Sequence, residues 1–290
     1  MDGRQGAAGR EGAGRMSGNT QIRKGHGDLV PQSRGWTLIT GASSGLGAEF
    51  ARIAARGGRR LILSARSEDR LEKLASELRE RVEVVVIPAD LARPGAAERL
   101  WREASEGRRI EILVNNAGLG LNRRFGDGGV EEAEKLVAVN VSAATVLMQA
   151  AVGHMRREGA GHILNVASVA AFVPGPGMAV YHATKAYLLS LSDAVTAELQ
   201  AEDSDVAITA LCPGPVETGF FDAAGMSSDG PSGPMRPARA RDVAQAGWEA
   251  MLARRQTVVP GGMTRLAAFA GRVLPRGLTA RIAGRAYGKA

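Results

Sequence analysis

With 290 residues, of which 44% are hydrophobic, the chain is long enough for one large domain with a buried core and too apolar to be disordered throughout. Its formal net charge of +7 comes from the two ends, because residues 35–261 hold 25 basic and 27 acidic side chains. This balance argues against a nucleic-acid-binding face on the central domain, and the single cysteine, Cys212, excludes an internal disulfide.

Residues 1–34 are rich in Gly, Arg and small polar residues, with little apolar content before Trp36. This composition predicts a disordered N-terminal tail. The tail lacks the apolar stretch of about 7–15 residues that a signal peptide needs, and Met16 is a candidate second start. We therefore expect a cytoplasmic protein, which the lone cysteine also favours.

From Trp36 onward, short runs of branched apolar residues alternate with longer helical patterns. Strands that alternate with helices form parallel sheets covered on both faces, so this order predicts one Rossmann-like, doubly wound α/β domain over residues 35–261. Ligands of such sheets bind at the carboxyl ends of the strands, where the strand order reverses. The seven expected strands are 36–40, 61–65, 82–87, 110–115, 162–167, 206–212 and 257–260, and the expected helices are 45–56, 68–79, 95–106, those within 131–157, 180–200 and 241–253.

The first motif, TGASSGLG at residues 40–47, directly follows the first expected strand and opens the first helix. Gly41 permits a tight turn, Gly45 lets the backbone approach a pyrophosphate, and Gly47 lets the helix pack closely. Free amides at the helix start bind anions, so we expect a dinucleotide phosphate site that also includes Ser43, Ser44 and Leu46. A purely structural connector is the alternative, since the spacing is G-x-x-x-G-x-G.

The end of the second expected strand indicates which dinucleotide binds. A site for NAD places an acidic residue there for the ribose diol, whereas this chain has Ala65 followed by Arg66. A guanidinium pairs well with a 2′-phosphate, so Arg66 predicts NADP(H), with Ser43 or Ser44 as a second phosphate contact. A solvated arginine at a helix start is the alternative.

The longest charge-poor stretch, residues 136–153, contains Asn140, Ser142, Thr145 and Gln149. This polar content predicts a buried interface helix rather than a membrane span.

The segment YHATK places Tyr181 and Lys185 four residues apart, so that a helix presents both side chains on one face. A tyrosine titrates near pH ~10, and a nearby cation lowers that pKa toward the range where a phenol exchanges protons. An ordinary amphipathic helix is the alternative. We do not expect His182 to be catalytic, because the next residue on a helix points away from the Tyr181 face.

Taken together, the motifs resemble the short-chain dehydrogenase/reductase family, in its shorter non-extended branch, over residues 36–260. The motifs that carry the resemblance are TGASSGLG, Asp90–Leu91 after the third strand, NNAG at residues 115–118, Asn140, Ser168, YHATK, and PGPVET at residues 213–218.

The resemblance implies a catalytic set of Asn140, Ser168, Tyr181 and Lys185. Tyr181 would exchange a proton with the substrate oxygen while hydride, in family members the pro-S hydride, passes to or from the nicotinamide. Ser168 would hydrogen-bond that oxygen. Lys185 would lower the pKa of the phenol and bind the nicotinamide ribose, and Asn140 would bind a water that links the lysine to solvent.

The cofactor contacts also follow from the resemblance. Asp90 and Leu91 would bracket the adenine, residues 116–118 would run beside the adenosine ribose, and residues 213–218 would hold the carboxamide, while Asn115 is expected to be structural. The full predicted set is Gly41, Ser43, Ser44, Gly45, Leu46, Gly47, Arg66, Asp90, Leu91, Asn116, Ala117, Gly118, Tyr181, Lys185, Pro213, Gly214, Val216 and Thr218, with no metal site.

The segment after PGPVET, residues 219–237, covers the substrate in the family. Phe220, Phe221 and Met226 predict an apolar lid here, and residues 172–178 contribute Phe172, Val173 and Met178 to an apolar pocket. We therefore expect a hydrophobic carbonyl or alcohol as substrate, and a homodimer or homotetramer as the assembly.

Residues 262–290 hold six basic and no acidic side chains and form a predicted amphipathic C-terminal extension. Its apolar stripe is Leu266, Phe269, Ala270, Val273 and Leu274, its arginines face elsewhere, and Pro275 should break or kink it. We favour docking of this extension on the lid or on a neighbouring subunit, with peripheral contact to a membrane as the alternative.

Three functions are consistent with these features. The leading hypothesis is an NADP(H)-dependent carbonyl reductase or alcohol dehydrogenase. The alternatives are a non-catalytic NADP-sensing regulatory protein on the same fold, which would not need Tyr181 and Lys185, and a membrane-associated lipid or acyl ketone reductase.

Overall fold

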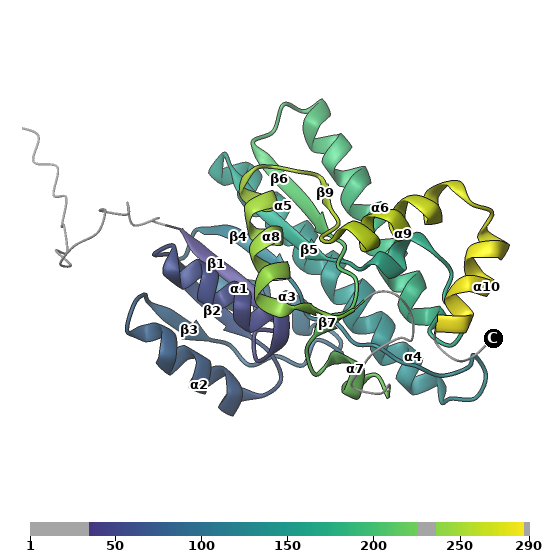
Figure 1. Ribbon diagram of the computed structural model, residues 1–290. Helices are drawn as coiled ribbons and strands as arrows, with labels where there is room; N and C mark the ends of the chain where they lie inside the picture. Colours follow the sequence, from purple (N-terminus) through teal and green to yellow (C-terminus); the bar gives the residue numbers. More distant parts are fainter. Residues whose placement is uncertain (1–34, 226–235, 287–290) are drawn as a thin grey trace, which may run out of the picture. The chain divides into compact units, whose positions relative to one another are not determined.

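The computed structural model describes residues 35–225 and 236–286 (Figure 1). The predicted disorder of residues 1–34 and the predicted place of Met226 in the lid lie outside the described residues.

Seven parallel strands form one sheet in the order β3-β2-β1-β4-β5-β6-β9, which confirms the predicted fold class. The strand order reverses at β1, which pairs with β2 on one side and with β4 on the other. The carboxyl ends of these strands are therefore where a ligand is expected. The strands are β1 Trp36–Thr40, β2 Arg60–Ser64, β3 Val84–Val86, β4 Ile110–Asn115, β5 Gly161–Val166, β6 Val206–Leu211 and β9 Thr257–Val258.

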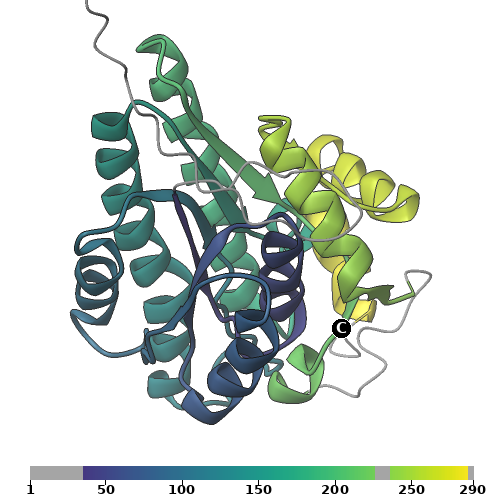
Figure 2. The same cartoon turned by 90° about the vertical axis from the view of Figure 1, so that its left-hand side faces the viewer.

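Helices cover both faces of the sheet (Figures 1 and 2). One face carries α1 Gly45–Arg56, α2 Glu68–Arg79 and α8 Ala240–Leu252, and the other carries α3 Ala96–Ser105, α5 Ala144–Glu158 and α6 Ala179–Ala201. Successive residues of a strand point to opposite faces, so Ile39 of β1 belongs to the first of these two apolar layers and Leu38 to the second. Both layers exclude water, which explains why the strands read as continuous apolar runs.

The helix predicted within residues 131–157 is interrupted. α4 Val130–Val137 is followed by a π-helical turn, η1 Ala138–Ala143, which runs directly into α5. The joined segment Val130–Glu158 is long and apolar enough to cross a membrane, yet half of its most apolar window is buried inside the fold. A buried core helix gives this signal too, which agrees with the burial predicted from the polar residues of this stretch, while its place at a subunit interface stays a prediction.

Several short elements lie between the later strands of the central sheet. η2 Val169–Phe172 comes directly after Ser168, β7 Val216–Glu217 pairs in parallel with β8 Ala238–Arg239, and α7 is Phe220–Ala223. The chain ends in two further helices, α9 Gly262–Val273 and α10 Arg276–Ala286. They meet at Pro275, as the sequence predicts, because proline cannot continue the helix that precedes it.

Candidate active site

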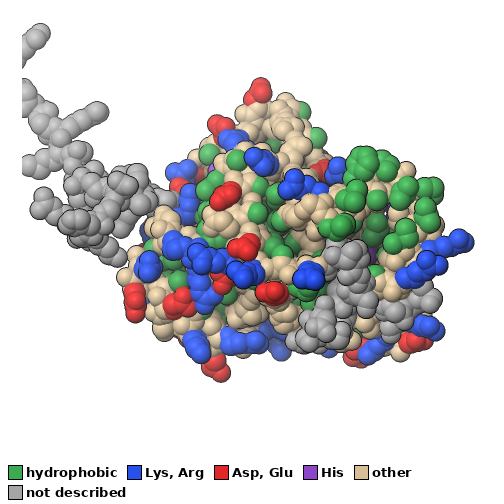
Figure 3. Space-filling view, in the orientation of Figure 1, with side chains coloured by type: hydrophobic (Ala, Val, Ile, Leu, Met, Phe, Trp, Pro, Cys, Tyr) green, Lys and Arg blue, Asp and Glu red, His purple; other side chains and the backbone are tan. Residues whose placement is uncertain are grey.

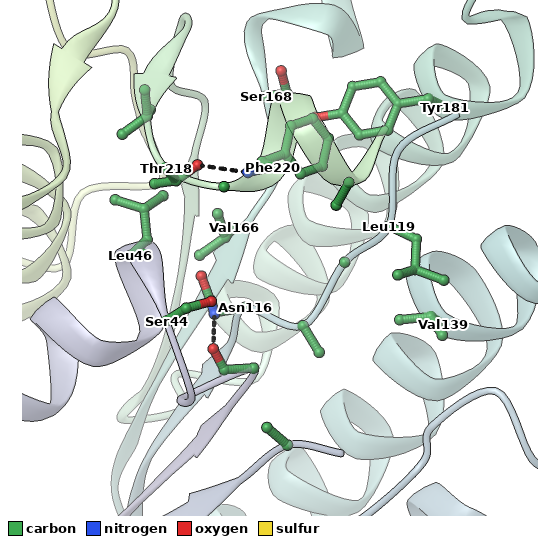
Figure 4. Close-up of a pocket in the computed structure, with 18 of the residues that line it drawn as sticks. Ser44, Leu46, Asn116, Leu119, Val139, Val166, Ser168, Tyr181, Thr218 and Phe220 are labelled. Carbon is green, nitrogen blue, oxygen red and sulfur yellow. Dashed lines mark hydrogen bonds between the residues drawn. The ribbon is translucent and has the colours of Figure 1, made fainter. Parts of the chain in front are cut away.

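A cleft of about 630 Å³ opens at the carboxyl ends of the central strands. Every predicted cofactor residue except Gly47 lines it, as do Ser168, Tyr181 and Lys185 of the predicted catalytic set. Figure 4 shows Ser168, Tyr181 and Phe220 together at one end, above Ser44 and Asn116. Strands that are far apart in the sequence therefore bring one continuous set of side chains to a single cleft.

The glycine turn has the tight geometry that its residues predict. Gly41 and Gly45 have φ angles of +64° and +55°, a region that favours glycine. A Cβ at Gly47 would lie 2.2 Å from the carbonyl oxygen of Gly41, so this glycine allows α1 to start directly against the turn. Within the described chain, no side chain caps the start of α1, which begins after the extended Ser44. Its first amides face the cleft and suit a phosphate.

Thr40 holds the glycine turn beside the end of β4, a role that was not predicted from the sequence. Its buried hydroxyl oxygen accepts hydrogen bonds from the amides of Asn116 and Ala117, both at 3.0 Å. The side-chain amide of Asn116 donates in return to the carbonyl oxygens of Thr40 and Gly41, at 2.9 and 3.2 Å. These bonds join the ends of β1 and β4 at the reversal point of the sheet. The only sequence signal was the place of Thr40 as the first residue of TGASSGLG.

The end of β2 presents two arginines to the cleft. Arg66 and Arg70 are both exposed and both line it, together with Ser67, whose hydroxyl oxygen accepts a hydrogen bond from Nε of Arg70 at 3.1 Å. The sequence analysis named Arg66 and missed Arg70, although Arg70 follows one helical turn later. Two guanidinium groups here form a positively charged corner that suits a phosphate.

Asp90 and Leu91, which follow β3, line the cleft, and their expected place beside the adenine stays a prediction. Asp90 stabilises its own turn, because its carboxylate accepts a hydrogen bond from the amide of Ala92 at 3.2 Å. Asn115 lies behind the cleft, and its side chain donates to the carbonyl oxygen of Ala144 at 2.8 Å. It ties β4 to α5, which fits the structural role predicted for it.

The other end of the cleft is formed by Ser168, which follows β5, and by Tyr181 and Lys185, on α6. All three side chains are buried. The Tyr181 phenol is hydrogen-bonded to the Ser168 side chain. The Lys185 ammonium lies 5.8 Å from the centre of the Tyr181 ring and donates to the carbonyl oxygen of Val166 at 2.8 Å. That bond fixes the lysine against the last residue of β5.

The protein groups around the phenol shift its pKa in the direction opposite to our expectation. Burial raises the pKa of Tyr181 to about 12, and the hydrogen bond with Ser168 lowers it only in part. Burial also lowers the pKa of Lys185 to about 8. Desolvation therefore dominates the pKa of the phenol, and Ser168, not Lys185, is the group that acts against it.

Asn140 is buried beside the cleft without lining it. Its side-chain oxygen accepts from the amide of Leu119 at 2.8 Å, and its nitrogen donates to the carbonyl oxygen of Leu119 at 2.9 Å and to the Thr184 hydroxyl at 3.1 Å. It lies in the π-helical turn, a distortion that often marks functional sites. Asn140 thus joins the loop after β4 to the helix of Tyr181 and Lys185. Its predicted link to water stays a prediction.

Apolar side chains pack around the Tyr181 ring at this end of the cleft. The ring of Phe220, on α7, lies 5.4 Å from that of Tyr181, between centroids. Phe220 and Met178 line the cleft as predicted, and Leu119 and Val139 are lining residues that the sequence analysis missed. The backbone amide of Phe220 donates to the Thr218 hydroxyl at 3.3 Å, which anchors the start of α7 (Figure 4).

The placement of Phe172 and Val173 in the pocket was wrong. Both lie outside the residues that line the cleft and pack on α9, where a Cβ at Gly271 would lie 2.7 Å from the carbonyl oxygen of Phe172 and 2.8 Å from Cγ1 of Val173. Phe172 ends the 3₁₀ turn η2, and Val173 follows it with an extended backbone.

His182 is a positioning residue rather than a proton donor in the cleft. Its ring is buried, and Nδ1 lies 2.7 Å from the carbonyl oxygen of Val173. A Cβ at Gly175 would lie 2.2 Å from its Nε2, so the loop packs tightly on the ring. His182 therefore ties α6 to the segment that leads to Met178. Burial lowers its pKa, which favours the neutral ring.

Comparison with known proteins gives consistent results. The family model described as short chain dehydrogenase matches residues 35–228. A short-chain dehydrogenase from Sphingobium yanoikuyae, solved in complex with NADPH, is 34% identical, with a TM-score of 0.74 over 82% of this chain and 92% of its own. A bulky-bulky ketone specific alcohol dehydrogenase from Comamonas testosteroni is 31% identical, with a TM-score of 0.70 over 79% and 86%. A short chain dehydrogenase/reductase from Burkholderia phymatum, in complex with NAD, is 26% identical, with a TM-score of 0.72 over 83% and 92%.

Proposed function

The chain belongs to the short chain dehydrogenase family of oxidoreductases, and on that premise we propose that it uses NADP(H) to interconvert a carbonyl and an alcohol on a hydrophobic small molecule. In this proposal Tyr181 is the general acid and base. The observation that carries it is the single cleft that runs from the glycine turn after β1 to the buried Ser168, Tyr181 and Lys185.

The residues at the phosphate end fit a dinucleotide. The glycine turn admits close backbone approach, the first amides of α1 are available to an anion, and Gly118 leaves room beside Lys185, where an added Cβ would lie 3.4 Å from Nζ. Bound NADPH would supply the hydride. The chain supplies the rest: Ser168 orients the substrate oxygen, Tyr181 gives or takes its proton, and Lys185 holds a positive charge beside the ring.

A phenol with a pKa raised to about 12 stays protonated at neutral pH, so it is ready to donate a proton. This state suits the reduction of a carbonyl, in which negative charge develops on the substrate oxygen. The cation at Lys185 would stabilise the phenolate that forms, because Coulomb attraction is strong in a site that excludes water.

The choice of NADP(H) over NAD(H) is the finer part of the proposal. Arg66 and Arg70 support it, because their guanidinium groups suit a 2′-phosphate and the lining of the cleft at β2 contains no acidic residue among the described positions. The relative from S. yanoikuyae was solved with NADPH, whereas the one from B. phymatum was solved with NAD. The family alone therefore leaves the nucleotide open, and the two arginines carry the inference.

A hydrophobic substrate is supported by the apolar residues that line the cleft, which are Leu119, Met178 and Phe220 beside Tyr181, together with Val139. The relative from C. testosteroni is specific for bulky-bulky ketones, and a pocket of this character would admit ketones with apolar groups on both sides. The cytoplasmic location and the homodimer or homotetramer stay predictions.

The test is a panel of hydrophobic ketones, aldehydes and alcohols, monitored by the absorbance of NADPH and, in parallel, of NADH. We expect turnover of apolar carbonyls with a preference for NADPH. Arg66→Asp should reduce that preference about 10-fold or more, since a charge-assisted hydrogen bond contributes roughly 1.5–3 kcal/mol. Arg81→Asp is the matched control, because Arg81 is exposed just beyond the end of α2, the helix that follows Arg66, and lies outside the cleft.

Two results would count against the proposal. Binding of NADPH without turnover of any substrate in the panel would favour the non-catalytic regulatory protein. An equal response to Arg66→Asp and Arg81→Asp would remove the argument for NADP(H) while leaving the oxidoreductase itself intact.

A further inference from the structure

The two C-terminal helices expose an apolar surface. Seven of the twelve large hydrophobic side chains that the described residues expose lie on α9, on α10 or between them. On α9 they recur every three or four residues, so they share one face of that helix. The α9–α10 apolar surface consists of Met263, Leu266, Phe269, Val273, Leu274, Leu278 and Ile282.

The α9 stripe does not dock on the described part of the lid, which was one of the two placements that the sequence favoured, while docking on a neighbouring subunit stays a prediction. Phe269 and Val273 are 62% and 60% exposed, so the apolar stripe of α9 is not buried against the described part of the chain. The opposite side of α9 makes the contact with the domain, through the buried Thr264 and Ala268 and through Gly271, which touches Phe172. A packed helix with its apolar stripe turned to solvent needs a partner outside the fold.

The charges around this surface indicate the partner. Residues 262–286 contain five arginines, all exposed, and neither Asp nor Glu. Figure 3 shows hydrophobic side chains gathered where Figure 1 draws α9 and α10, with Lys and Arg side chains at the edge. The arginines are Arg265, Arg272, Arg276, Arg281 and Arg285.

A second copy of the chain fits this surface poorly. In a two-fold contact each surface meets itself, so the arginines of one copy would face those of the other without an acidic residue from the same helices to pair with them. An anionic lipid surface complements both features, because its headgroups attract the arginines and its acyl region accepts the apolar side chains.

We propose that α9 and α10 form a peripheral membrane-binding surface that lies on anionic lipid, with the α9–α10 apolar surface inserted between the headgroups. A further contact attaches α9 to the domain. The Arg272 guanidinium lies 4.9 Å from the centre of the Phe172 ring, and Phe172 ends the short turn η2 that begins directly after Ser168. Membrane contact would therefore hold the catalytic domain beside the lipid, where hydrophobic carbonyl compounds concentrate.

The test is flotation of the full chain with vesicles of phosphatidylcholine, with and without phosphatidylserine. We expect the protein to float with the anionic vesicles at low salt, to bind neutral vesicles at least ~10-fold more weakly, and to dissociate as the salt concentration rises. The double variant Leu266→Ser/Phe269→Ser should lower binding at least ~10-fold. The matched control is Phe125→Ser, because Phe125 is 84% exposed on a loop outside this surface.

Circular dichroism and NADPH binding should be unchanged in both variants, since the replaced side chains are exposed and lie outside the cleft. Failure of the full chain to float with anionic vesicles would overturn the proposal, as would equal flotation of the double variant and the unaltered chain. Sedimentation equilibrium tests the rival partner, a second copy of the chain. Self-association that the double variant abolishes, in a chain that binds no vesicles, would assign the surface to a second copy. The outcomes of flotation and of sedimentation do not depend on whether the enzyme uses NADPH.

Discussion

Replacing Lys185 by methionine should make the folded protein respond differently to pH, because this lysine is buried in the cation form. Burial lowers the pKa of Lys185 from its ordinary value of 10.5 to about 8. Between these values the unfolded chain binds more protons than the folded one, so the contribution of Lys185 to stability rises with pH. At pH 7 both states are protonated, and the buried charge destabilises the fold in full.

The size of the effect follows from the shift. At about 1.4 kcal/mol per pKa unit, the buried cation costs about 3 kcal/mol at pH 7 and less than about 1 kcal/mol at pH 10. Lys185→Met keeps the volume and removes the charge, but it leaves the carbonyl oxygen of Val166 without its donor. That loss costs roughly 1–3 kcal/mol at either pH, so it cancels when the two pH values are compared.

The assay is urea unfolding of the unaltered chain and the variant at pH 7 and pH 10, without added cofactor. The effect of Lys185→Met on the free energy of unfolding should be about 2 kcal/mol more favourable at pH 7 than at pH 10. Lys73→Met is the control, because Lys73 is exposed on α2. The same effect at both pH values would refute the reasoning, since it would mean that the fold does not bury a cation at this position.

Three further substitutions test the surroundings of the site. Ser168→Ala should lower kcat roughly 100-fold or more by removing a donor to the substrate oxygen. It should also move the alkaline limb of the pH–rate profile to higher pH, because the Ser168 hydrogen bond lowers the pKa of Tyr181. An unchanged pH–rate profile would contradict this effect of Ser168 on the Tyr181 pKa. His182→Phe keeps an aromatic ring but loses the contact with the Val173 carbonyl oxygen. The KM for hydrophobic substrates should therefore rise several-fold with little change in kcat. A large loss of kcat would instead indicate that His182 is catalytic. Arg70→Ala should weaken NADPH binding while leaving NADH binding unchanged, as measured by titration of each nucleotide, and equal losses for both would remove Arg70 from the 2′-phosphate site.

The local pattern of the chain was sufficient to predict the order and type of the main elements. α1 spans Gly45–Arg56 as predicted, because the glycine turn forces its start and Gly57 follows its end. The seven strands were recognisable because each is a run of branched apolar residues between helical patterns. Topology then placed the motifs together, since the carboxyl ends of parallel strands meet at one edge of the sheet.

Features that depend on packing were not predictable in this way. The π-helical turn around Asn140 is one example. The Asn140 side chain there bonds to Leu119 and to Thr184, which are both far from it in the sequence. The pair β7–β8 joins two-residue strands more than twenty residues apart, too short to leave a periodic signal. The raised pKa of Tyr181 depends on how much water the fold excludes, whereas YHATK fixes only the spacing of the phenol and the ammonium.

The most direct test of the account compares the unaltered chain with Tyr181→Phe in the NADPH-dependent reduction of a hydrophobic ketone, with the dissociation constant of NADPH measured in parallel. The variant keeps the ring that packs on Phe220 and loses only the hydroxyl. The account predicts a loss of turnover of about 100-fold or more with nearly unchanged NADPH binding. Turnover equal to that of the unaltered chain would contradict it, because the phenol would then have no part in proton transfer.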